Sequence, residues 1–119
     1  MKIIIKGAKI EVTNAIEVYI EKKLSSVEKF VVAYGDGEVL AEVEIGKTTE
    51  HHHSGDIFRA EVNLSTNGKQ FRATSEKSDL YAAIDDMRDE LVRVLNSCKD
   101  KERTLFRRGA SAIKKLLKI

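Results

Sequence analysis

Residues 58–75, FRAEVNLSTNGKQFRATS, hold the clearest local pattern in this 119-residue chain. Apolar and polar residues alternate before and after a short central break, which predicts two half-buried strands. The break contains Asn67 and Gly68, and this pair suits a type I′ turn because both central residues of that turn need a positive φ. The stretch therefore predicts an antiparallel hairpin.

Two strands and a helix are predicted before the hairpin. Residues 2–6 alternate as a short strand would, and a period of two from 38 to 46 predicts a longer strand. Between them, apolar residues recur at helical spacing with glutamates and lysines on the other side, so we expect a helix over about 14–30. Either Asn14 or Thr13 can cap it.

A second helix is predicted after the hairpin. Ser78 and Asp79 open it, since a cap residue followed by an acid suits the positive end of the helix dipole. It continues to about residue 98. The charged run at 99–103 is either a hinge or a continuation of this helix, and a short basic helix follows. The stripe that we expect to be buried contains Tyr81, Ile84, Met87, Leu91, Leu95 and Cys98.

The predicted order is β-α-β-β-β-α plus a basic C-terminal helix. An antiparallel four-stranded sheet with both helices on one face would bury the helical stripes and the inward strand residues in one core. The sequence therefore predicts an α+β two-layer sandwich. The first strand needs a crossover to rejoin the sheet. We expect one domain over 1–100 and a helical tail over 101–119.

Charge is divided unevenly along the chain. The net charge of +2 combines 13 Lys/Arg and 17 Asp/Glu in residues 1–98 with 8 Lys/Arg and 2 Asp/Glu in residues 99–119. An acidic-leaning body thus carries a basic tail. Such a tail favours a polyanionic partner, and a tail that only adds solubility is the alternative.

Composition indicates a cytoplasmic protein. The apolar fraction of 42% is ordinary for a globular domain, and no stretch approaches the roughly 20 apolar residues of a membrane span. A lysine interrupts the apolar N-terminus too early for a signal peptide. The single cysteine, Cys98, cannot form an internal disulfide, which fits a reducing compartment.

Histidines 51–53 and the carboxylates of the second helix are the candidates for metal binding or catalysis. Adjacent residues on an extended chain point in different directions, so three consecutive histidines are poorly arranged to hold one ion. Asp85, Asp86, Asp89 and Glu90 lie on the outward side of the predicted helix, where ordinary pKa values are expected. With no phosphate loop or nucleophile elbow, the sequence predicts neither an enzyme nor a cofactor.

Basic residues are the stronger candidates for a binding surface. They recur along both predicted helices, so two helices lying side by side could present them in one direction and follow a phosphate backbone. The acids between them weaken this surface. The basic residues are Lys22, Lys23 and Lys29 on the first helix, and Arg88, Arg93 and Lys99 on the second.

Several blocks of sequence also occur in the order of one known family. Residues 55–64, GDIFRAEVNL, followed by 79–85, DLYAAID, resemble the ribosome hibernation promoting factor family. Its members are also called ribosome-associated inhibitors or ribosomal subunit interface proteins. Residues 3–7, 12–16 and 24–30 fit the same pattern, and the histidine run resembles a family loop. The resemblance covers roughly residues 1–100.

The resemblance implies a fold similar to a double-stranded-RNA-binding domain and a role on the bacterial ribosome. Family members occupy the decoding channel of the small (30S) subunit and block messenger and transfer RNA during stress or slow growth. The expected partners are the 30S subunit, the 70S ribosome and 16S rRNA, with no membrane and no DNA. The protein is expected to be monomeric off the ribosome.

Positions in the family pattern imply which side chains contact RNA. The helix surface would use Lys22, Lys23, Lys29, Arg88, Arg93 and Lys99, with Lys77 beside the start of the second helix. The tail would extend the contact through Lys101, Arg103, Arg107 and Arg108.

The chain departs from the family pattern in two ways. Members usually carry more lysine or arginine on the second helix, where this chain has acids. Long members have a second domain that pairs ribosomes, and this chain resembles the short class. Three alternatives remain open: a general double-stranded RNA binder, an interaction module whose tail docks on a protein or an anionic membrane, and a metal-dependent enzyme using the histidine loop.

Overall fold

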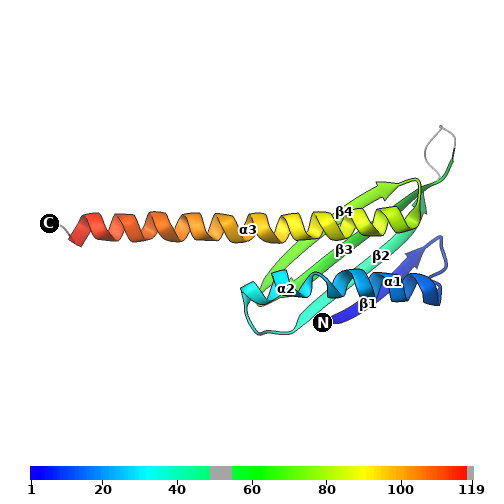
Figure 1. Ribbon diagram of the computed structural model, residues 1–119, viewed down its shortest axis with the longest axis horizontal. Helices are drawn as coiled ribbons and strands as arrows, with labels where there is room; N and C mark the ends of the chain where they lie inside the picture. The colour runs from blue at the N-terminus through cyan, green and yellow to red at the C-terminus, as the bar shows by residue number, and fades with distance from the viewer. Residues whose placement is uncertain (49–54, 118–119) are drawn as a thin grey trace.

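The computed structural model describes residues 1–48 and 55–117, and it shows four strands and a layer of helices (Figure 1). The side chains of 106 and 110–117 lie outside the description. In chain order the elements are β1 (Lys2–Ala8), α1 (Asn14–Ser25), α2 (Glu28–Val31), the 3-10 turn η1 (Val32–Tyr34), β2 (Val39–Thr48), β3 (Ile57–Thr66), β4 (Lys69–Lys77) and α3 (Leu80–Leu117).

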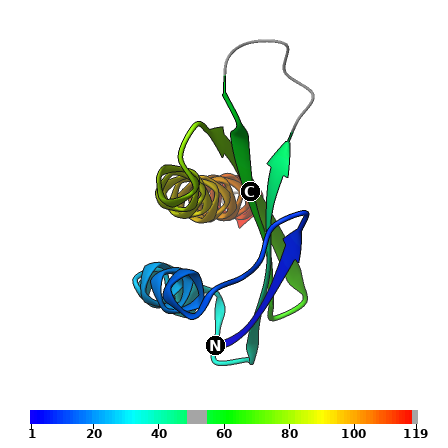
Figure 2. The ribbon, with the colours of Figure 1, turned by 90° about the vertical axis from the view of Figure 1, so that its right-hand side faces the viewer.

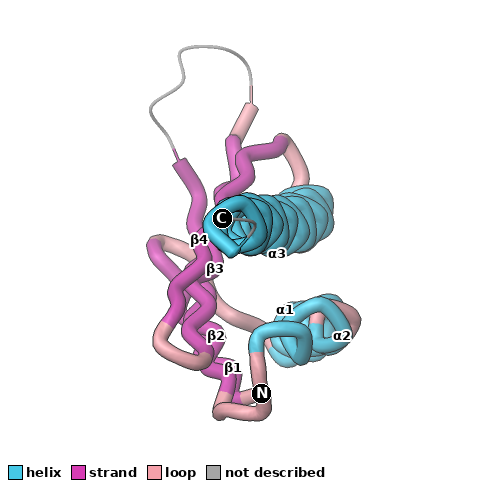
Figure 3. The backbone as a smooth tube through the Cα atoms, turned by 90° about the vertical axis from the view of Figure 1, so that its left-hand side faces the viewer, coloured by secondary structure: helices cyan, strands magenta, loops and turns pink. Residues whose placement is uncertain are grey.

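The fold is the predicted α+β two-layer sandwich. The strands form one sheet in the order β1-β2-β3-β4, and the described helices all lie on one of its faces (Figures 2 and 3). The sheet is mixed, so the expectation of an antiparallel sheet is wrong at one edge. Strand β1 pairs parallel with β2, because the helical crossover between them returns the chain to the end of the sheet where β1 began.

The predicted hairpin is confirmed. Strands β3 and β4 pair antiparallel, with Thr66 opposite Lys69. Asn67 and Gly68 have φ values of 50° and 76°, the left-handed region that this tight turn requires. The alternation also holds, since Ala60, Val62 and Leu64 of β3 are buried against the helices.

The first helix begins where expected but ends earlier. Thr13 is its cap, and its Oγ1 accepts a hydrogen bond from the Ile16 N–H at 3.3 Å. The helix predicted over 14–30 is divided into α1 and α2. Near the division, the hydroxyls of Ser25 and Ser26 donate to backbone carbonyls one turn back. Such bonds compete with the regular helical pattern and account for the division.

Helix α3 continues without a hinge over 38 residues. The run at 99–103 therefore continues the second helix, and no separate terminal helix follows within the described residues. Its buried stripe begins at Leu80, whereas Tyr81 is 38% exposed, so the prediction that Tyr81 is buried is wrong. A rotation of about 100° per residue places Tyr81 toward α1, where its ring meets that of Tyr19 edge-on.

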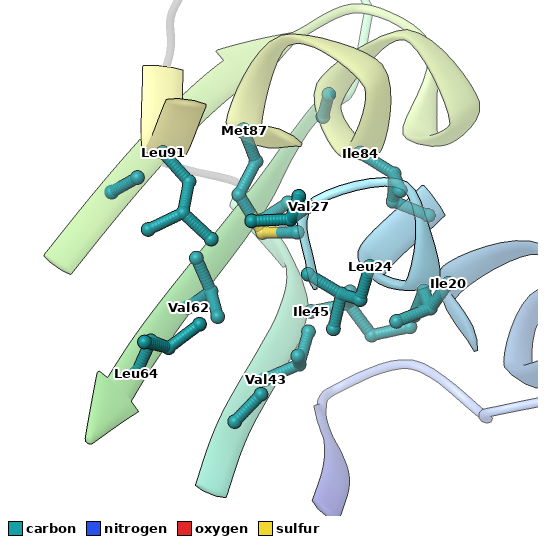
Figure 4. Packing of buried hydrophobic residues seen from close by; sticks show 14 of the residues in the cluster. Ile20, Leu24, Val27, Val43, Ile45, Val62, Leu64, Ile84, Met87 and Leu91 are labelled. Atoms are coloured by element: carbon teal, nitrogen blue, oxygen red, sulfur yellow. The ribbon is translucent and has the colours of Figure 1, made fainter. Parts of the chain in front are cut away.

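One hydrophobic core joins the two layers (Figure 4). Val43 and Ile45 of β2 meet side chains from both helices, including the fully buried Leu24 and Met87. Half-buried Cys98 packs against this core, as predicted. Among the described residues, no helix combines the length and the apolarity needed to cross a membrane.

Candidate nucleic-acid interface

Helices α1 and α3 lie side by side on the same face of the sheet (Figures 2 and 3). Tyr19 and Lys23 of α1 reach the same carboxylate of α3. The Tyr19 hydroxyl donates to Asp85, and the Lys23 Nζ lies 3.1 Å from the same Oδ1. The basic strips of both helices therefore belong to one layer, but acids lie among them.

Asp85 has two donors from α1 although its side chain is still 44% exposed. The hydrogen bond from Tyr19, followed by that from Lys23, lowers its pKa below the ordinary value. The same contacts raise the pKa of Tyr19 and that of Lys23. The expectation of an ordinary pKa is wrong for Asp85 because α1 covers this part of α3 and supplies donors that the sequence of α3 alone does not show.

Two arginines predicted to contact RNA also have acidic partners. Arg88 lies 3.0 Å from Asp89 and donates through Nε to the Ser26 hydroxyl of the α1–α2 connection. Arg93 binds Glu90 through two nitrogens, at 3.0 and 2.5 Å. This pairing lowers the pKa of Glu90, so the expectation of an ordinary pKa is wrong for Glu90 as well. The centre of the predicted RNA-binding strip is therefore locally neutralised.

Asp86 has a different environment from its acidic neighbours. It accepts a hydrogen bond from the Ser75 hydroxyl of β4 at 2.6 Å. This bond ties the first turns of α3 to the sheet, although the Asp86 residue remains exposed to solvent, as expected.

A cluster around Tyr34 holds α3 where the helix leaves the sheet. The Tyr34 hydroxyl donates to the Leu95 carbonyl at 2.5 Å, and burial raises the pKa of this phenol to about 12. The Lys99 Nζ lies 5.2 Å from the centroid of the Tyr34 ring and donates a hydrogen bond to the Ala33 carbonyl. Lys69 lies over the same ring and pairs with Glu102. The sequence did not identify this cluster, because its members are far apart along the chain.

The other predicted contacts are exposed, and the described residues provide them with no ion-pair partner. One group of these cations lies on the body of the protein and the other lies on α3. Those on the body are themselves spread over its length. Lys77 lies next to the start of α3, whereas Lys29 belongs to α2 near the other end of the helix layer. The complete set is Lys22, Lys29 and Lys77 on the body, and Lys101, Arg103, Arg107 and Arg108 on α3.

Beyond Glu102, α3 extends away from the sheet (Figure 1), and the molecule measures 67 × 32 × 18 Å. A shallow hollow of about 690 Å³ runs along one helix face and is lined by Arg93, Lys101 and Arg108 among others. At 1.5 Å per residue, these cations lie about 12 Å and 10 Å apart along the axis. A row of cations on a rigid helix can follow a phosphate backbone.

Metal chemistry has no site in the part of the chain that the structure describes. No three His, Cys, Asp or Glu side chains there are placed to hold an ion. The histidine run 51–53 falls outside the described residues.

Comparison with known proteins gives a consistent result. The family model of sigma 54 modulation protein / S30EA ribosomal protein matches residues 3–103. A ribosome hibernation promoting factor of Klebsiella oxytoca is 34% identical over 101 residues, which cover 85% of this chain and 96% of that protein.

Solved structures share the architecture. The N-terminal domain of Protein Y from Thermus thermophilus superposes with a TM-score of 0.65 at 34% identity, covering 80% of this chain and 96% of that one. A ribosomal subunit interface protein from Coxiella burnetii gives a TM-score of 0.67 at 17% identity, covering 84% and 99%. The second likeness concerns the fold alone.

Proposed function

The chain belongs to the family of sigma 54 modulation proteins and S30EA ribosomal proteins, which includes ribosome hibernation promoting factors, and we propose that it binds the ribosome and inhibits translation. The observation that carries this proposal is the family match over residues 3–103. The exposed cations on the extended part of α3 support it, because ribosomal RNA presents dense phosphate charge.

Within this function, the binding site is the decoding channel of the 30S subunit, in free subunits and in 70S ribosomes. The protein contacts 16S rRNA there and occupies the space of messenger and transfer RNA. Inhibition is steric, so neither a covalent step nor a cofactor takes part. A-form RNA hides its base edges, so recognition depends on shape and on phosphate contacts.

The exposed cations are the principal anchors. Lys101, Arg103, Arg107 and Arg108 lie on the extended part of α3. Asp100 and Glu102 are the only acidic residues in the sequence from 99 to 119. Lys22, Lys29 and Lys77 add contacts from the body.

The paired cations contribute less. Lys23, Arg88 and Arg93 would have to exchange a carboxylate for a phosphate, and Lys99 would have to leave the Ala33 carbonyl. Exposed ion pairs are worth only about 0–1 kcal/mol, so such exchange is accessible but gives a smaller net gain.

Co-sedimentation with 30S subunits and with 70S ribosomes, at a low and at a physiological salt concentration, tests the proposal. We expect near-stoichiometric binding that weakens with salt and is lost when mRNA and tRNA already fill the channel. The variant Lys101→Ala/Arg103→Ala/Arg107→Ala/Arg108→Ala should bind far more weakly. Lys2→Ala/Lys6→Ala, on exposed lysines of β1, should bind normally, and it is matched in charge to the smaller variant Arg107→Ala/Arg108→Ala.

Two results would contradict the proposal. Failure to sediment with ribosomes at physiological salt would remove ribosome binding. Equal affinity for a naked RNA duplex would indicate a general double-stranded RNA binder instead.

A further inference from the structure

An apolar groove lies at the end of the body where α3 leaves the sheet. Its volume is about 310 Å³, and its apolar lining includes side chains that remain open to solvent, with Val32 67% and Met1 38% exposed. The residues that line it are Met1, Glu28, Val31, Val32, Gly35, Asp36, Gly37 and Val39. We call it the η1 groove.

The rim of the η1 groove is acidic. Glu28 and Asp36 line it, and the adjoining hollow beyond Met1 and Val39 is lined by Glu38 and by one cation, Lys2, so carboxylates outnumber basic side chains. All three carboxylates are exposed, and within the described residues none of them has an ion-pair partner. An apolar surface with a negative rim is complementary to a segment that is both apolar and basic.

The loop that shapes the groove is held in place by the hairpin. The Asn67 Oδ1 accepts a hydrogen bond from the Gly37 N–H at 3.1 Å. Gly35 has a φ of 130°, and the Asn67 side chain lies only 2.8 Å from where a Cβ on Gly35 would be. The groove is therefore formed before any partner arrives.

One segment of the same chain has the complementary chemistry. We call residues 99–117 of α3 the projecting segment. Leu105 in it is 65% exposed, and Arg103, Arg107 and Arg108 surround it in sequence and are also exposed. Leu105 stays open to solvent because the helix has already left the sheet at this point (Figure 1).

The groove of the same copy is out of reach of this segment. The Lys99 Nζ donates to the Ala33 carbonyl, so η1 lies beside α3 where the projecting segment begins. The segment then continues away from that point as a straight helix (Figure 1). A second copy running in the opposite direction would bring its own projecting segment back toward this end of the body.

We propose that two free copies pair antiparallel, so that the projecting segment of each lies in the η1 groove of the other. Nineteen residues of helix span about 28 Å, enough to reach the partner's body. The contact is reciprocal and closed by a two-fold axis, as in most homodimers. Opposite charges meet in both grooves, which offsets the repulsion between the two basic helices.

The pairing has a regulatory consequence, which rests on the proposed function. The cations covered in the pair are those proposed to bind rRNA, so the ribosome would compete with the second copy for them. Protein that is not bound to a ribosome would then be a dimer in which the projecting segment of each copy is covered.

Sedimentation velocity of the full chain, over a range of concentrations and at two salt concentrations, tests the pairing without ribosomes. We expect a dimer at low salt that dissociates as salt rises. Glu28→Lys/Asp36→Lys reverses the charge of the η1 groove, and Arg107→Glu/Arg108→Glu reverses the charge of the projecting segment. The dimer dissociation constant of each variant alone should be at least about tenfold higher than that of the unmodified chain, because like charges then face each other.

An equimolar mixture of the two variants provides the sharpest readout. Both contacts of the mixed pair are between opposite charges, one as in the unmodified chain and the other with the signs exchanged, so the mixture should pair more readily than either variant alone. Glu42→Lys/Glu44→Lys, on exposed residues of β2, is the matched control and should pair like the unmodified chain. Circular dichroism of each variant checks that it folds.

Three outcomes would overturn the inference. The unmodified chain could be monomeric at every concentration, which is what the sequence-based expectation holds. The two variants could leave the dimer unchanged, or their mixture could pair no better than each variant alone. None of these results bears on ribosome binding, so the two proposals can fail separately.

Discussion

Asp85 shows how a single residue changes its role when two helices meet. It accepts a hydrogen bond from Tyr19, which lies 66 positions away in the sequence, and it is 3.1 Å from Lys23. Without these partners it would be one of several surface acids on α3. With them it links α1 to α3 and withdraws Lys23 from the surface that RNA could contact.

Asp85→Asn should lower the free energy of unfolding by about 1 kcal/mol, since one charge-assisted hydrogen bond and one half-exposed ion pair are weakened. The pKa of Asp85 is lowered in the folded state. Its contribution is therefore complete above the unfolded value near 4 and is lost as pH falls through the lowered folded value. Urea unfolding at neutral and acid pH measures the difference between Asp85→Asn and the unmodified chain.

Glu42→Gln is the control for this measurement, because Glu42 is exposed and forms no ion pair among the described residues. It should leave stability unchanged at both pH values. The loss of unfolding free energy in Asp85→Asn could instead stay the same at a pH below the pKa of Asp85 in the folded state. That result would show that the carboxylate charge is not its cause.

At the scale of elements, α3 consists of two differently stabilised parts. Ile84, Met87, Leu91 and Leu95 are buried and hold the first part against the sheet. The projecting segment lacks such a buried stripe in its described side chains, so its helix depends on intrinsic propensity, which is marginal for short helices in water. Gly109 lies in its interior and weakens it.

Gly109→Ala should strengthen the projecting segment by about 0.5–1 kcal/mol, because alanine loses less backbone entropy in a helix. A Cβ at this position meets nothing within 4 Å. Amide hydrogen exchange of residues 104–117 should slow by roughly two- to fivefold, the rate equivalent of that free energy.

Gly46→Ala in β2 is the contrasting variant. A Cβ there would lie 3.2 Å from the Ala8 carbonyl oxygen, so this substitution should give no gain and should leave exchange in the projecting segment unchanged. Faster exchange in Gly109→Ala would contradict the view that propensity limits this helix.

At the scale of the whole molecule, charge and shape are coupled. Residues 1–98 carry an excess of acids and residues 99–119 an excess of bases, and α3 carries the basic part away from the body (Figure 1). A phosphate-rich partner can therefore approach the projecting segment without meeting most of the body's carboxylates.

Arg107→Ala/Arg108→Ala should weaken ribosome binding and reduce the slope of log affinity against log salt by about one for each phosphate that is no longer neutralised. Titration of binding at several salt concentrations measures this slope. Arg88→Ala/Arg93→Ala is the matched comparison, because these two arginines already pair with Asp89 and Glu90, and it should change the slope less. A larger effect of Arg88→Ala/Arg93→Ala would place the main RNA contact on the part of α3 that packs beside α1 instead.

Local pattern accounts for most of the fold. The hairpin turn at Asn67 and Gly68, the period of two in β2 and β3 and the cap at Thr13 all depend on residues close in sequence. Sequence-based prediction fails where a residue's position depends on contacts with residues distant in the sequence. The helical spacing predicts Tyr81 in the core, but the rotation of α3 that seats Leu80 against the sheet turns Tyr81 toward Tyr19.

The candidate site was predictable only as a set of basic residues. Their number and their helical spacing are visible in the sequence, and so is the contrast between an acidic-leaning body and a basic tail. The sequence does not show which of these cations already have a partner. Lys23 of α1 pairs with Asp85 of α3, and Lys99 donates to the Ala33 carbonyl, which lies 66 positions earlier in the sequence.

The sequence by itself determined the elements, the α+β class, the family resemblance and the uneven charge, because periodicity, turn residues and composition are local or additive properties. Only the tertiary structure decided the parallel pairing of β1, the continuity of α3 beyond the sheet, the Tyr34 cluster and the η1 groove. Those features depend on which distant side chains come within contact distance, and that is set by how the two layers pack around one core.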